Sequence, residues 1–146
     1  MSLALIEKER EWVLPTRGRT VSRCVIDHAF SLDLWSPEDV ITLRLQGEFK
    51  LHIAGKGYRL SPESPDGPTS LAPALALLHK GVGKGIAYKD GALKLDFHGG
   101  EWLSVEPDDH FEAWDLTSDS EEPLRIVCLP GGQLAVWRPT RRLRQR

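Results

Sequence analysis

The sequence has few of the residues that reveal chemistry or hold a small fold together. It contains two cysteines and one methionine among 146 residues, and Pro73 interrupts its longest aliphatic run, residues 71–78. That run is far shorter than the roughly 20 apolar residues that span a bilayer. The first residues also lack the pattern of a secretory signal. We therefore expect a cytoplasmic protein without membrane contact, with Cys24 and Cys128 reduced and buried.

Recognisable catalytic and metal-binding motifs are also missing. No two of the five histidines have a spacing that would place them together on one helix or strand face, and there is no Gly-x-Ser-x-Gly elbow. Segment 81–85 resembles a phosphate loop, but it follows an expected helix instead of preceding one. We read it as a helix stop and a flexible entry to a strand. We favour a protein that is not an enzyme, and we assign it no catalytic residue, metal or cofactor.

What is present indicates one β-rich domain. Apolar and polar residues alternate in short segments such as 30–34, 41–45 and 93–97. These segments recur about every eight to twelve residues, which is typical of antiparallel sheets. We predict an α+β fold, mostly antiparallel β-sheet with one main helix. A single domain covers 1–137, of which 1–11 is a flexible lead-in, and 138–146 is an arginine-rich tail.

The main helix is expected at about 70–80. Leu71, Leu75 and Leu78 lie at positions i, i+4 and i+7, so they share one face of an α-helix. Ser70 is a suitable N-cap, and Gly81 can end the helix in the left-handed conformation. We expect the three leucines to pack the helix onto the sheet.

Two segments repeat each other without a gap. Residues 27–34 read DHAFSLDL and residues 90–97 read DGALKLDF. Each match predicts a hairpin that turns at an aspartate, and the two related hairpin units could pack about a pseudo-two-fold axis. A cleft between the units, lined by Asp27, Asp90 or His28, would make the protein a small-ligand binder or an enzyme. Aspartate before a small residue is also what a tight turn requires, and we favour that role.

Charge is distributed unevenly along the chain. Residues 101–122 contain nine acids and no Lys or Arg, whereas residues 123–146 contain six arginines and no acid. An acidic surface with aromatic residues in it can attract and anchor a basic protein. Our leading hypothesis is a non-catalytic protein-binding module, for example an immunity-type inhibitor. Its predicted partner-binding residues are Asp109, Glu112, Trp114 and Asp115. Nucleic-acid contact through the tail is disfavoured because no nucleic-acid-binding motif accompanies it, and the oligomeric state is left open.

Several motifs together resemble one uncharacterised family. They are Gly18-Arg-Thr-Val21, the apolar run at 71–78, PDDHFEAWDL at 107–116 and LPGGQLAVW at 129–137. The family consists of small bacterial proteins, mainly actinobacterial, that carry a domain of unknown function. The resemblance covers roughly residues 12–137, so it implies one domain over nearly the whole chain. The family has no established activity, and the resemblance therefore implies no mechanism.

Overall fold

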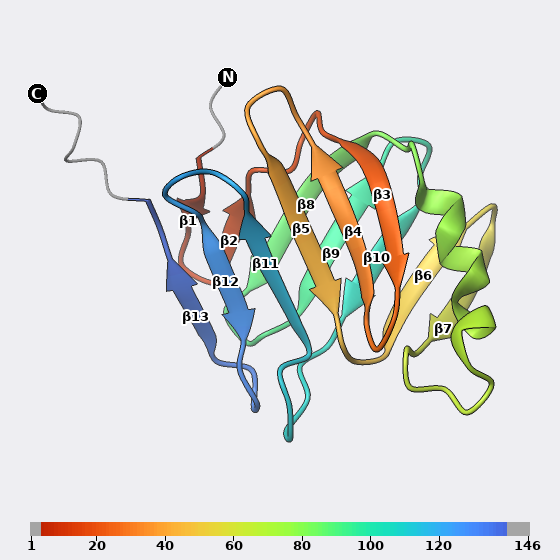
Figure 1. Ribbon diagram of the computed structural model, residues 1–146. Helices are drawn as coiled ribbons and strands as arrows, with labels where there is room; N and C mark the ends of the chain where they lie inside the picture. Colours follow the sequence, from red (N-terminus) through yellow and green to blue (C-terminus); the bar gives the residue numbers. More distant parts are fainter. Residues whose placement is uncertain (1–3, 140–146) are drawn as a thin grey trace, which may run out of the picture.

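Two antiparallel β-sheets pack face to face in the computed structural model, which describes residues 4–139 (Figure 1). Sheet A consists, in spatial order, of β1 (Ile6–Glu7), β2 (Glu11–Leu14), β8 (Val82–Tyr88), β9 (Leu93–Phe97), β10 (Trp102–Val105), β6 (Phe49–Ile53) and β7 (Lys56–Leu60). Sheet B consists of β13 (Leu134–Trp137), β12 (Arg125–Cys128), β11 (Trp114–Ser118), β5 (Val40–Leu45), β4 (Phe30–Trp35) and β3 (Thr20–Ile26). The predicted class, mostly antiparallel β with one helix, is confirmed.

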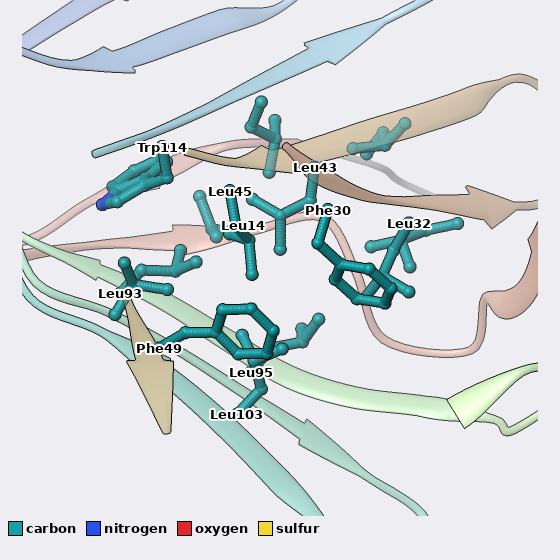
Figure 2. Packing of buried hydrophobic residues seen from close by; sticks show 14 of the residues in the cluster. Leu14, Phe30, Leu32, Leu43, Leu45, Phe49, Leu93, Leu95, Leu103 and Trp114 are labelled. Atoms are coloured by element: carbon teal, nitrogen blue, oxygen red, sulfur yellow. The ribbon is translucent and has the colours of Figure 1, made fainter. Parts of the chain in front are cut away.

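The core lies between the two sheets. Because side chains alternate across a strand, every second residue points into this space, and the buried cluster joins residues from both sheets. Figure 2 shows Phe30 of sheet B beside Phe49 of sheet A; their rings stack with centroids 5.6 Å apart. Trp114 is fully buried at one side of this cluster (Figure 2). The alternation that predicted the strands is therefore the alternation that fills the core.

The chain changes sheet three times, first between β2 and β3, and the two later changes match each other. After β5 in sheet B it enters sheet A as β6, beside β10, and after β10 it enters sheet B as β11, beside β5. The predicted hairpins at the repeated segments are β3–β4 and β8–β9. Both turn in the same way, because Asp27 Oδ1 accepts the Ala29 N–H at 2.8 Å and Asp90 Oδ1 accepts the Ala92 N–H at 3.1 Å. A common origin of the two hairpins stays a prediction.

The helix differs from the prediction. It is a 3-10 helix, η1 (Pro68–Leu77), with Gly67 at its N-cap in place of Ser70. A 3-10 helix repeats every three residues, so Leu71, Ala74 and Leu77 face the core. Leu75 and Leu78, which we expected to pack inward, are exposed. The left-handed residue after the helix is His79 instead of Gly81. No helix in residues 4–139 has both the length and the apolar character needed to cross a membrane.

The start of the described chain belongs to sheet A. β1 pairs with β2, and Leu5 is buried in the core, so the described part of 1–11 joins sheet A, and the flexibility of this lead-in stays a prediction. Arg138 follows β13 and donates a hydrogen bond to the Leu5 carbonyl at 3.1 Å. The arginines of the predicted tail beyond residue 139 lie outside the described residues.

One end of the sandwich is organised by Arg19, whose side chain is 1% exposed. Its guanidinium donates to the carbonyls of Pro15 and Leu34, at 2.8 and 3.1 Å, and to the Asp39 carboxylate at 2.7 Å. These bonds join the β2–β3 loop to the β4–β5 turn. We call this part of the molecule the Arg19 end.

Candidate functional site

The end of the sandwich opposite Arg19 is built from three chain segments that touch one another. They are the β8–β9 turn, the loop 106–113 between β10 and β11, and the β12–β13 turn, which Figure 1 shows away from the β4–β5 turn. The Gly131 N–H donates to the Asp108 carbonyl at 2.8 Å. Gly91 lies so close to Gly132 that a Cβ on Gly91 would sit 2.6 Å from the Gly132 Cα. We call this part of the molecule the acidic end.

Five carboxylates gather at the acidic end. They are Asp90, Glu106, Asp108, Asp109 and Glu112. Asp108 Oδ1 accepts the His110 N–H at 2.7 Å, and Asp90 holds its own turn. Among the residues that the structure describes, none of the five forms an ion pair with a lysine or arginine. No ion pair in the described chain therefore neutralises their negative charge.

A groove lies beside these carboxylates. Its volume is about 220 Å³, and it runs between the β5–β6 turn and the first part of the loop 106–113. Pro107 gives it an apolar wall, and Glu48, Glu106 and Asp108 bring carboxylates to it. Lys50 and Arg59 also line the groove, but Glu48 pairs with Arg59 at 2.6 Å. This volume is below the roughly 300–1,000 Å³ of pockets for drug-sized ligands, and it suits a single side chain.

Two of the four predicted partner-binding residues lie at the acidic end. Asp109 is exposed and Glu112 is half-buried, both in the loop 106–113. The prediction that they contact a partner remains open.

Trp114 cannot serve as a surface anchor. Its side chain is 0% exposed, and its Nε1–H donates to the Gly91 carbonyl at 2.9 Å. This assignment was wrong because β11 begins at Trp114, and the first residue of the strand points into the core. The indole instead ties the β8–β9 turn to β11 and so helps to position the acidic end.

Asp115 occupies the outer face of sheet B. It is half-buried, and its strand neighbours in register are Arg44 on β5 and Val127 on β12. Burial raises the pKa of its carboxyl, whereas the charges of Arg125 and Arg44 lower it and that of Glu112 raises it. Its two arginine neighbours already balance its charge, so it adds little to the field of the acidic end.

The acids of residues 101–122 do not form one continuous strip. Glu101 lies 3.5 Å from the Lys80 ammonium, and Asp119 Oδ1 accepts the Val40 N–H at 2.9 Å beside the β4–β5 turn. Trp102, the other indole in this segment, lies on the outer face of sheet A and stacks on His52 with centroids 5.7 Å apart. Acids that are close together in the sequence are therefore divided between the two ends of the sandwich and between its two sheets.

Two signals in the sequence could have assigned Asp90 to the acidic end. Gly131 and Gly132 in one turn, and Gly91 after Asp90 in the other, all have positive φ. Glycine in this conformation also permits close backbone approach, and these two turns pack against each other. Glu48 gave no such signal, because only the pairing of β6 with β10 brings it to the groove.

The residues of the alternative cleft lie on separate turns. Asp27 and His28 lie on the β3–β4 turn of sheet B, and Asp90 lies on the β8–β9 turn of sheet A. Each aspartate bonds to the backbone of its own turn, and none of the three residues lines the groove. Within residues 4–139, no group of three His, Cys, Asp or Glu side chains is placed to hold a metal ion.

The cysteines are separate, and Cys128 is buried as predicted whereas Cys24 is only half-buried. Cys24 is on β3 and Cys128 on β12, with three strands of sheet B between them, and both are free. Burial raises the pKa of both thiols, and that of Cys128 reaches about 11. The carboxylates of Asp90 and Glu112 add to the shift of Cys128, which is a sign of the negative potential at the acidic end.

The fold and this site define a two-sheet antiparallel β protein with an unpaired acidic end. Residues 12–138 match the family of unknown function DUF6188, and the chain belongs to this family. The match begins on β2 and ends just after β13, so it covers both sheets. No curated protein and no solved structure matches the chain.

Proposed function

We propose that this protein is a non-catalytic binding module whose acidic end contacts a basic surface on another protein. The observation that carries the proposal is the group of five carboxylates that no described lysine or arginine pairs with. Unpaired charge of one sign costs the fold some repulsion, and it gives fast, salt-dependent association with a surface of opposite sign. Such a surface suits an inhibitor of a basic protein, including an immunity-type partner of a secreted toxin.

The groove supplies a place for one basic side chain of the partner. An arginine or lysine stem can pack against Pro107 while its charged head reaches Glu106 or Asp108. Buried aromatic and arginine contacts carry most of the energy in protein interfaces. The loop 106–113 then provides steering, and the groove provides the anchoring contact.

The experiment compares two charge-reversed variants with equal net charge. Asp109→Lys with Glu112→Lys alters the acidic end, whereas Glu9→Lys with Glu121→Lys alters exposed acids elsewhere. The basic protein that wild-type chain captures from its native source is purified, and association rates are measured over a salt series. We expect the first variant to associate at least about tenfold more slowly and with a weaker salt dependence, and the second to match wild type. Equal rates for the two variants would exclude the acidic end as the contact.

A further inference from the structure

The two outer faces of the sandwich differ in composition. The six strands of sheet B contain no lysine and no glutamate, whereas the strands of sheet A contain Lys50, Lys56, Lys84, Lys94, Glu7 and Glu11. The charged residues of the sheet B strands are arginine and aspartate. Interface cores are enriched in arginine and tryptophan and depleted of lysine, glutamate and aspartate. The outer face of sheet B therefore matches an interface in its arginines and tryptophans and in its lack of lysine and glutamate, whereas Asp33 and Asp115 depart from that composition.

Exposed tryptophans mark this face. Trp35 at the end of β4 is 48% exposed and Trp137 at the end of β13 is 53% exposed, and the Arg125 guanidinium lies 5.6 Å from the Trp137 ring. Val127 and Ser31 lie on the same face and are buried. Tryptophan and arginine are the residues most often found as energetic anchors of interfaces.

The charges on this face alternate in sign across the strands. Arg23 on β3 lies 3.9 Å from Asp33 on β4, and Arg44 on β5 is in register with Asp115 on β11. In a two-fold interface, residue i of one copy contacts residue j of the other copy, and j contacts i in return. A surface that carries charges of both signs can therefore face a rotated copy of itself with opposite charges in contact. A face of one sign would repel its own copy, and this one would not.

The area agrees with a weak dimer. Six strands about 4.8 Å apart, each contributing about five residues at roughly 3.3 Å, give a face of about 29 by 17 Å. Two such faces bury about 1,000 Å², which is near the lower limit for a specific interface. We infer that the outer face of sheet B is the docking surface for a second copy of this chain, which forms a two-fold dimer with micromolar affinity. This inference does not depend on the acidic end.

The test places an arginine at the centre of each outer face. Thr117 of β11 is in register with Thr42 and Arg125 on sheet B, and Ser104 of β10 is in register with Lys94 and Lys50 on sheet A. Thr117→Arg and Ser104→Arg therefore make the same change beside cations on opposite faces. Masses are measured by sedimentation equilibrium up to about 200 μM, where a micromolar dimer is well populated.

We expect the mass of wild type and of Ser104→Arg to rise from one chain to two with concentration, whereas Thr117→Arg stays at one chain. Circular dichroism and thermal unfolding confirm that each variant is folded. Should Thr117→Arg fail to fold, Trp137→Ser provides a change at the exposed edge and should weaken the dimer at least tenfold. Wild type that stays at one chain, Thr117→Arg or Trp137→Ser that pairs like wild type, or a folded Ser104→Arg that loses pairing would each overturn the inference. Asp109→Lys with Glu112→Lys should still dimerise, which separates this result from the proposed function.

Discussion

The Arg19 end and the acidic end both carry carboxylates, but within the described chain only the Arg19 end pairs one of them with an arginine. Asp39 pairs with buried Arg19, and Asp119 caps the Val40 N–H nearby. At the acidic end, within the described chain, five carboxylates lack a cationic partner. The same residue types thus hold one end together and leave the other charged. Whether a carboxylate has an ion-pair partner, rather than how many acids lie nearby, decides whether it is structural or available to another molecule.

The largest expected effect comes from removing the guanidinium at the Arg19 end. Arg19→Met leaves the Asp39 carboxylate and the carbonyls of Pro15 and Leu34 without their donor. Breaking a buried pair on one side costs about 3–5 kcal/mol, and we expect this loss in the free energy of unfolding by urea. Glu112→Gln at the acidic end is the control and should change it by less than about 0.5 kcal/mol. Similar losses for the two variants would remove the distinction between the ends.

The turns at the two ends differ in how tightly they pack. Gly91 has φ +106° and its Cβ would collide with Gly132, whereas Gly100 in the β9–β10 turn has φ +94° and open space around it. Gly100→Ala should cost about 1–2 kcal/mol from left-handed backbone strain. Gly91→Ala adds overpacking of about 1–3 kcal/mol, so its melting temperature should be clearly the lower of the two. Equal melting temperatures would show that the two turns at the acidic end can separate.

Asp115 gives a pH-dependent comparison. Burial raises the pKa of this carboxyl above its unfolded value, so the charged form is penalised in the folded state above that pKa. The penalty disappears as the pH falls below the unfolded value of about 3.9. Asp115→Asn should therefore raise the free energy of unfolding at pH 7 by less than about 1 kcal/mol, and the gain should vanish toward pH 3. A loss at pH 7 would mean that attraction to Arg44 and Arg125 outweighs burial.

The smallest effect is expected from neutralising the acidic end. Asp109→Asn with Glu112→Gln removes like-charge repulsion and breaks no described ion pair. The melting temperature at low salt should stay constant or rise slightly, by the equivalent of less than about 0.5 kcal/mol. A clear destabilisation would assign these carboxylates a structural role like that of Asp39.

Local pattern predicted the strands well and the helix poorly. The alternation at 30–34, 41–45 and 93–97 corresponds to β4, β5 and β9. In the segment 71–78, nearly every residue is apolar, so spacing alone could not separate a repeat of 3.6 from one of 3. Segment 81–85, interpreted as a flexible entry, is largely β8, where the Thr16 hydroxyl donates to the Gly83 carbonyl at 2.9 Å. Close packing against Thr16 explains Gly85 and close packing against His98 explains Gly81, and only the fold reveals these contacts.

By itself the sequence determined the class of fold, the two aspartate-turned hairpins and the acidic composition of residues 101–122, because each depends on residues that are neighbours along the chain. Only the tertiary structure decided which carboxylates are neutralised, that Trp114 is in the core, and that Asp90 joins the loop 106–113. Those outcomes depend on the chain crossing from one sheet to the other between β5 and β6 and again between β10 and β11. These crossings bring together residues that are far apart in the chain, and no local pattern records them.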